Sequence, residues 1–171
     1  MQNHFALFHL PQQFIIDTAA LDRAYHEVQN QVHPDKFVAG SDAEKRVAMQ
    51  WATRANEAYQ TLRAPLRRAT YLCELNGTDL QTESNTAMPM PFLLQQMQWR
   101  EALDAARAQR DGAELDQLDT QVKEGWQACY DASATAIAQG DFVQAARIVR
   151  EWMFLEKFRE EIGRVYDTLD G

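Results

Sequence analysis

The sequence is poor in residues that break helices and in residues that form disulfides or metal sites. It has 7 glycines and 5 prolines among 171 residues, so long irregular loops are not expected and helices are favoured. The two cysteines, Cys73 and Cys129, are far apart, which implies no disulfide framework and favours a reducing compartment. No CxxC or HExxH pattern is present, so we expect no metal site and no cofactor.

Long apolar runs and clusters of basic residues are also missing. No run approaches the 18 apolar residues of a membrane span, and the opening MQNHFALFHLPQQF lacks the features of a signal peptide. Residues 1–75 contain 8 Lys and Arg against 8 Asp and Glu, whereas residues 76–171 contain 9 against 17. Because phosphate binding needs clustered cations, this distribution argues against a nucleic-acid partner. We therefore expect a cytoplasmic protein that binds neither membranes nor nucleic acids.

Helical periodicity dominates the first half of the chain. Apolar residues recur at three- and four-residue steps from Leu21 to Val32, and Pro34 must end that helix. A second helix is predicted to begin at the capping box of residues 41–44, and a short third helix at Pro65. The predicted buried face of the second helix consists of Val47, Trp51, Ala55, Ala58, Tyr59 and Leu62.

The second half predicts a helical bundle. Residues 76–91, rich in Gln, Thr, Ser, Asn, Met and Pro, are the best candidate for a linker. Three helical patterns follow in residues 92–171, with turns at Asp111-Gly112 and Gly140-Asp141. Short connections place neighbouring helices antiparallel, which predicts a three-helix bundle. Since no segment alternates with period two, the predicted class is all-α, with domains at 1–75 and 92–171.

The stretch QVHPDKF, residues 31–37, lies between the first two predicted long helices. His33 and Asp35 would form the acid–base pair of a metal-dependent hydrolase, but no nucleophile or glycine-rich phosphate loop accompanies them. A second interpretation is a simple helix stop, because proline commonly ends helices. A third is a shaped turn that another protein recognises, and the residues around the turn favour this one.

The HPD tripeptide sits at the tip of two antiparallel helices and is followed by NEAYQTLRAPLRRATYL. This combination resembles the J-domain of DnaJ-type co-chaperones. The opening FALFHLPQQFIID, the HPDKF extension and the helical second half resemble one family in particular, HscB, the J-type co-chaperone of iron–sulfur cluster assembly. The likeness covers essentially the whole chain and is weakest at residues 76–91. It implies an L-shaped regulator with a J-domain, a C-terminal bundle and no catalytic residues.

The resemblance implies that the HPD turn binds a DnaK-type chaperone ATPase, HscA-like, and stimulates its ATP hydrolysis. J-domains usually present a basic face on the helix before this turn, but here that helix has only Arg23 as a permanent cation, with Lys36 just past the turn. We therefore expect weak electrostatic steering and a binding step that depends little on salt. Arg63, Arg67 and Arg68 are either a solvated face or an accessory contact to the ATPase. The implied chaperone-binding residues are Arg23, Tyr25, His33, Pro34, Asp35 and Lys36.

The helical wheel of residues 92–106 leaves large apolar residues outside the main stripe. Leu93, Leu94 and Met97 fall outside it, and Phe154 falls outside the stripe of the last helix. Such residues fit either a wide core stripe or the apolar centre of a partner site. The inward stripe consists of Phe92, Gln96, Trp99, Leu103 and Ala106.

The resemblance favours a site for an iron–sulfur scaffold protein, IscU-like, on these helices. Gln98 departs from the acidic residue expected at its position, so one charge contact to the scaffold is missing. Two alternatives stay open: a J-domain co-chaperone for a different client, and the hydrolase interpretation of His33 and Asp35. The implied scaffold-binding residues are Leu93, Leu94, Met97, Gln98, Glu101 and Phe154.

Overall fold

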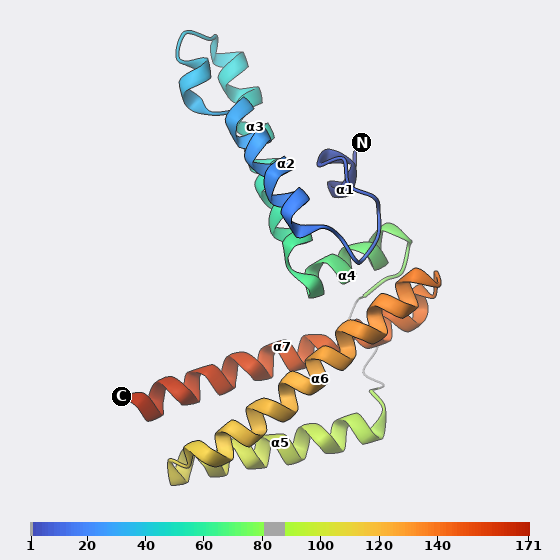
Figure 1. Ribbon diagram of the computed structural model, residues 1–171, viewed down its shortest axis with the longest axis vertical. Coiled ribbons are helices and arrows are strands. Elements are labelled where there is room, and N and C mark those ends of the chain that lie inside the picture. Colours follow the sequence, from blue (N-terminus) through green and yellow to red (C-terminus); the bar gives the residue numbers. More distant parts are fainter. Residues whose placement is uncertain (1, 81–87) are drawn as a thin grey trace. The chain divides into compact units, whose positions relative to one another are not determined.

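The computed structural model describes residues 2–80 and 88–171, and all regular structure within these ranges is helical, as predicted (Figure 1). The chain divides into two compact units, Met1–Leu75 and Asn76–Gly171. Residues 81–87 of the predicted linker lie outside the described ranges. The L shape stays a prediction. The elements are α1 (His4–Leu7), α2 (Thr18–Gln31), the 3₁₀ helix η1 (Pro34–Phe37), α3 (Asp42–Arg63), α4 (Pro65–Leu75), α5 (Met90–Gln109), α6 (Gly112–Ala138) and α7 (Phe142–Asp170).

Side-chain caps explain where the two long helices of the N-terminal unit begin. The Asp17 carboxylate accepts the Ala20 N–H at 3.1 Å and starts α2. The Ser41 hydroxyl oxygen accepts the Glu44 N–H at 3.2 Å and starts α3, and the same hydroxyl lies 3.3 Å from Glu44 Oε1. Serine and aspartate satisfy helix N–H groups that have no partner within the helix. The capping prediction for α3 is therefore confirmed.

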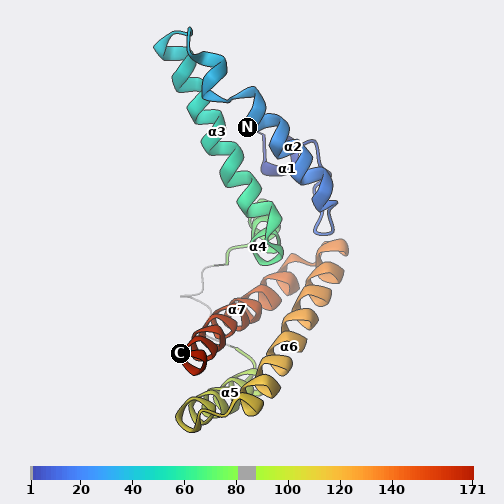
Figure 2. The same cartoon turned by 60° about the vertical axis from the view of Figure 1, so that its left-hand side comes forward.

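Helices α2 and α3 run antiparallel, and α1 packs against α3 (Figure 2). Of the residues predicted to be buried in the second half of α3, Ala55, Ala58 and Leu62 are each at most 1% exposed, whereas Tyr59 is only half-buried. The prediction is wrong for Val47 and Trp51, which are 52% and 39% exposed. Nearer the buried half of α3, the Arg54 guanidinium donates to the Gln2 carbonyl of the N-terminal segment. The early turns of α3 thus keep two large apolar side chains exposed.

One buried cation fastens the N-terminal unit. Arg68 on α4 is 3% exposed, and its guanidinium donates from Nε to the Phe14 carbonyl and from Nη1 to the Leu62 carbonyl, both at 2.6 Å. Arg63 and Arg67 are exposed. Arg68 is therefore a structural residue, and it belongs neither to a solvated face nor to an accessory surface.

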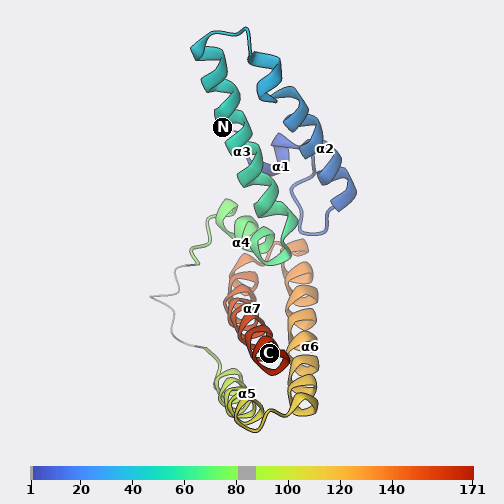
Figure 3. The same ribbon diagram turned by 90° about the vertical axis from the view of Figure 1, so that its left-hand side faces the viewer.

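In the C-terminal unit, α6 and α7 form a long antiparallel pair and α5 packs along both (Figure 3). Trp152 is fully buried, and its ring meets Trp126 edge to face at 5.2 Å between centroids. The turn between α5 and α6 lies at Arg110 and Asp111, one residue before the predicted Asp111-Gly112. Arg110 takes the left-handed conformation with φ 52°, whereas Asp111 caps α6 and Gly112 is its first residue. The bundle thus brings α5 and α7 side by side over a groove.

Candidate protein-binding surfaces

The HPD turn (His33, Pro34, Asp35) has a well-defined backbone. Val32 closes α2, and His33 then takes an extended conformation with φ −59° and ψ 135°. This conformation is the one that a following proline favours. Pro34 opens η1, and the Lys36 N–H donates to the His33 carbonyl at 3.0 Å. The backbone of the turn is therefore fixed by proline and by η1 together.

The polar side chains of the HPD turn face solvent. The His33 and Asp35 side chains are 57% and 88% exposed. His33 Nδ1 accepts the Asp35 N–H at 3.2 Å, which places the proton of the neutral ring on Nε2, the outer nitrogen. The Asp35 carboxylate also lies 3.5 Å from Nδ1, a contact that is attractive only when the ring is protonated. The turn therefore offers one ring N–H donor and one carboxylate acceptor to a partner.

The other residues predicted to bind the chaperone are divided by the structure. Lys36 is exposed on η1 beside the turn, and Arg23 is exposed on α2. Tyr25 is half-buried instead, because its ring stacks on Tyr59 at 4.1 Å between centroids. The Tyr25 hydroxyl also donates to Asn56 Oδ1 on α3 at 3.2 Å. Tyr25 thus joins α2 to α3, and its part in chaperone binding stays a prediction.

An apolar hollow of about 330 Å³ adjoins the HPD turn, and the sequence analysis missed it. Val32 and Phe37 line its side next to the turn, while Val47 and Trp51 line it from α3. Exposed apolar groups gathered beside polar ones are typical of protein-binding surfaces. The available signal in the sequence was that Val47 and Trp51 fall in the early turns of the second predicted helix, near the HPD turn. We call this hollow the tip groove.

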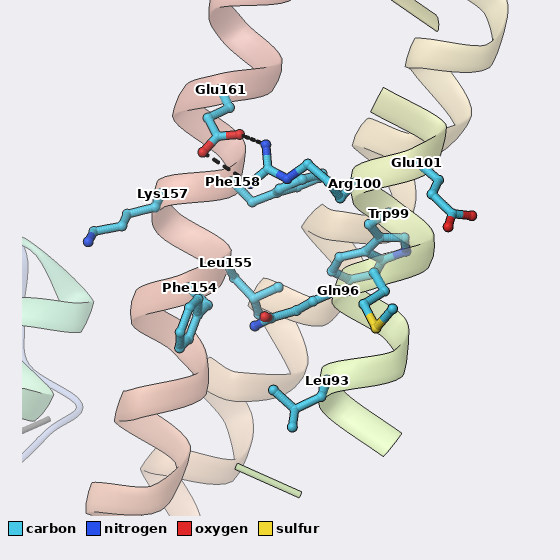
Figure 4. A pocket seen from close by; sticks show the side chains of 11 residues that line it. Leu93, Gln96, Trp99, Arg100, Glu101, Phe154, Leu155, Lys157, Phe158 and Glu161 are labelled. Atoms are coloured by element: carbon cyan, nitrogen blue, oxygen red, sulfur yellow. Dashed lines mark hydrogen bonds and ion pairs between the residues drawn. The ribbon is translucent and has the colours of Figure 1, made fainter. Parts of the chain in front are cut away.

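A larger groove of about 670 Å³ lies between α5 and α7 (Figure 4). Leu155 and the buried residues Trp99 and Phe158 contribute apolar surface to it. Of the residues predicted to bind the scaffold, Leu93, Met97, Glu101 and Phe154 line it. Leu94 and Gln98 are exposed on α5 outside the lining. We call this site the α5–α7 groove; its other lining residues are Gln96, Arg100, Lys157 and Glu161.

A charged pair bridges the two helices of the α5–α7 groove. The Arg100 guanidinium donates to both carboxylate oxygens of Glu161, and it lies 5.3 Å from the centroid of the Phe158 ring. The hydrogen bond from Arg100 lowers the pKa of the Glu161 carboxyl and raises the pKa of Arg100, so both groups stay charged at neutral pH. The groove therefore combines an apolar interior with a charged rim.

No metal site accompanies these surfaces in residues 2–80 and 88–171. The described residues contain no group of three or more His, Cys, Asp and Glu side chains that could hold a metal ion. Within the same ranges, no helix is both long enough and apolar enough to cross a membrane. The exposed HPD turn and the α5–α7 groove are the features that remain to be explained.

Relatives of the chain share nearly its whole length. A co-chaperone protein HscB homolog of Burkholderia multivorans is 51% identical over 168 residues, which cover 98% of this chain and 96% of the relative. The chain belongs to the HscB co-chaperone family. The family serves iron–sulfur cluster assembly, as the resemblance implied.

Structures of HscB proteins agree with this assignment. Chaperone HscB from Vibrio cholerae has a TM-score of 0.88 and 37% identity, and the match covers 98% of this chain and 99% of the other. Human co-chaperone protein HscB has a TM-score of 0.90 and 31% identity, with 95% and 81% covered. The model of the HSCB C-terminal oligomerisation domain matches residues 88–163, a range that includes the α5–α7 groove.

Membership of the HscB family excludes one of the interpretations of the HPD turn. HscB co-chaperones are not enzymes, so the hydrolase interpretation of His33 and Asp35 is wrong. A co-chaperone acts on a chaperone, which makes a chaperone partner part of the assignment. That the HPD turn contacts this partner stays a prediction.

Proposed function

We propose that this chain couples a DnaK-type chaperone ATPase, HscA-like, to an iron–sulfur scaffold protein, IscU-like. The HPD turn contacts the ATPase and stimulates ATP hydrolysis, while the α5–α7 groove holds the scaffold. The observation that carries the chaperone half is the exposure of the His33 and Asp35 side chains, 57% and 88%, on a fixed backbone. A fixed turn loses little conformational freedom on binding, so most of its contact energy remains as affinity.

The HPD turn acts on the ATPase without taking part in its chemistry. The His33 ring N–H and the Asp35 carboxylate bind one conformation of the chaperone better than the other and shift its equilibrium. Lys36 adds a charge beside the turn, and Arg23 adds a more distant one. Tyr25 contributes indirectly, by holding α2 on α3. The tip groove supports this assignment because it extends the exposed surface next to the turn.

The α5–α7 groove has the composition of a protein-binding site. Leu93, Met97 and Phe154 supply the apolar contacts, and Glu101 lies on the rim. Leu94 and Gln98 lie beside the groove and contribute at its edge. An apolar centre with a polar rim is the usual anatomy of an interface whose affinity depends on a few anchors. We therefore place the binding energy for the scaffold in the apolar contacts.

The chaperone half is tested by ATPase stimulation with and without scaffold, comparing the wild type with His33→Gln. We expect His33→Gln to lose stimulation under both conditions, because the ring that presents the donor is gone. His26→Gln is the matched control, since His26 is also exposed and lies on α2. Wild-type stimulation by His33→Gln would remove the HPD turn from the proposal.

The scaffold half is tested by calorimetry on the triple variant Leu93→Ala, Met97→Ala and Phe154→Ala. We expect affinity for the scaffold to fall more than about tenfold, because three apolar anchors are lost together. Helicity and scaffold-independent stimulation should stay at wild-type values. Val143→Ala is the control, since Val143 is 63% exposed on α7 outside the groove. Unchanged affinity in the triple variant would contradict the assignment.

The same measurements address the alternative of a different client. If the wild type binds unfolded model substrates and does not bind the scaffold, the client assignment is wrong while the chaperone half stands. The cytoplasmic location expected from the sequence stays a prediction. Cys73 and Cys129 are both buried.

A further inference from the structure

Gln96 is a polar residue inside the otherwise apolar part of the α5–α7 groove. Its side chain extends from α5 into the space between α5 and α7 (Figure 4). Its amide nitrogen Nε2 is buried and has no hydrogen-bond partner among the described residues. A buried donor without a partner costs about 1–3 kcal/mol relative to one that is paired. Gln96 therefore places an unsatisfied hydrogen-bond donor at the candidate binding site.

The neighbouring donors of the groove are already engaged within the chain. Trp99 Nε1 donates to Gln121 Oε1 at 3.1 Å, and the Arg100 guanidinium donates to Glu161. Lys157 is exposed and charged, so water satisfies its ammonium group. Among the described lining residues, Gln96 thus has the side-chain donor that is both buried and unpaired.

We propose that Gln96 donates a hydrogen bond to a main-chain carbonyl of the bound scaffold. This inference rests on the proposed function, which places the scaffold in the α5–α7 groove. An apolar side chain that enters the groove brings its own backbone close to α5 and α7. The carbonyls of that backbone lose water on binding and need a donor in exchange. Gln96 supplies this donor, and it favours a segment that presents a carbonyl next to its apolar anchor.

In the proposed complex, rotation about the last side-chain bond of Gln96 turns its amide N–H toward the carbonyl of the partner. This torsion is broad and nearly two-fold, so the rotation costs little. In the free protein the N–H lacks a partner, whereas in the complex it gains a carbonyl. Binding therefore improves the hydrogen bonding of both molecules, and Gln96 acts as a specificity-determining residue.

A purely structural role for Gln96 makes the opposite prediction for stability. If Gln96 stabilised the bundle, replacing it would lower the melting temperature. Binding would then weaken only as far as the bundle is destabilised. If it serves the partner, Gln96→Met removes an unpaired buried donor at nearly constant volume. The melting temperature then stays constant or rises while affinity falls. The two roles differ in the sign of the stability change.

The experiment is calorimetry with the purified scaffold protein, combined with thermal unfolding of each variant. Gln96→Met, which cannot hydrogen-bond, should weaken binding roughly tenfold, the effect of one lost hydrogen bond with a desolvated partner. Gln96→Glu, similar in shape but only an acceptor when ionised, should weaken it at least as much. Gln95→Met is the control, because Gln95 is the exposed neighbour outside the groove, and it should bind as the wild type does.

Three results would overturn the inference. Wild-type affinity of Gln96→Met would show that no hydrogen bond to the partner depends on this side chain. Wild-type or tighter binding by Gln96→Glu would show that the scaffold presents a donor there and not a carbonyl. A lower melting temperature in Gln96→Met would assign the residue to the bundle. If the triple variant at Leu93, Met97 and Phe154 binds normally, the proposed function itself fails, separately from these outcomes.

Discussion

Replacement of Arg68 by methionine should unfold the N-terminal unit at markedly lower denaturant concentration. The guanidinium is 3% exposed and donates to the Phe14 and Leu62 carbonyls at 2.6 Å. It also lies 4.9 Å from the centroid of the Phe14 ring. The first of these carbonyls belongs to the segment that leads into α2, and the second lies near the end of α3. One side chain therefore joins three parts of the unit.

Two opposing effects decide the size of the loss. Each hydrogen bond from a charged donor contributes about 1.5–3 kcal/mol, and both carbonyls lose their guanidinium partner in Arg68→Met. Against this, methionine removes the desolvation penalty of a buried cation, which amounts to several kcal/mol. Because the guanidinium is bonded on both sides and packed on an aromatic ring, we expect a net loss of about 2–4 kcal/mol.

The assay is urea unfolding followed by far-UV circular dichroism, with Arg67→Met as the matched control. Arg67 is exposed one position away on α4, so its replacement should change the free energy of unfolding by less than about 0.5 kcal/mol. Arg68→Lys should fall between the two, because one ammonium group replaces a fork that reaches two carbonyls. A loss of less than about 0.5 kcal/mol in Arg68→Met, or a gain, would show that desolvation outweighs the hydrogen bonds.

Further outcomes follow from single residues. Gly163→Ala on α7 should stabilise the fold by about 0.5–1 kcal/mol in urea unfolding, since nothing lies within 4 Å of the added methyl, whereas Gly140→Ala, at φ +73°, should destabilise it by about 1 kcal/mol. Burial, with a smaller contribution from Glu151, raises the pKa of the Cys129 thiol to about 11, so this thiol should resist alkylation at pH 8 in the native protein. The pKa of Cys129 is about 8.5 in the unfolded chain, so the folded state holds the thiol proton more tightly. The stability that this difference contributes should be complete below pH 8.5 and should decline toward pH 11. Alkaline unfolding of Cys129→Ala should lack this decline. Chaperone ATPase stimulation should change by less than about threefold between low and physiological salt, and a steep loss would contradict the weak steering expected from the few cations on α2.

Helix boundaries were predictable because their signals are local. The Ser41 cap, the proline at position 34 and the left-handed Gly140 act within a few residues of the chain, and each does in the structure what its type predicts. The turn before α6 was predicted one residue late, since Arg110 takes the left-handed position that glycine would favour. The nearest glycine instead begins α6, where its flexibility is not used.

Burial along α3 was not predictable because periodicity identifies a face and not the extent of its cover. Val47 and Trp51 lie on the same face as the buried Ala55, Ala58 and Leu62, yet their side chains are exposed. Which turns of a long helix receive a neighbour depends on the length and path of other segments. The tip groove arises from this mismatch, so it could be recognised only in three dimensions.

The wheel of α5 located one wall of the groove but not its chemistry. Leu93 and Met97 were predicted outside the inward stripe, and both line the α5–α7 groove. Gln96 was predicted inside that stripe, next to Trp99, and a glutamine at an inward position was the available signal. That its nitrogen lacks a partner depends on which donors and acceptors α6 and α7 bring near it. This information is absent from the sequence of one helix.

If coupling requires both surfaces on one chain, two variants with single defects should not rescue each other. A tethered scaffold meets the chaperone at an effective concentration in the millimolar range, far above that of free components in an assay. We expect an equimolar mixture of His33→Gln and the triple variant at Leu93, Met97 and Phe154 to lack scaffold-enhanced ATPase stimulation. The control is an equimolar mixture of the wild type and the His33→Gln variant, in which half of the chains carry both working surfaces. Full rescue by the mixture would mean that the surfaces act independently or that chains associate. Sedimentation velocity on the mixture separates these two explanations, because only association changes the mass of the sedimenting species.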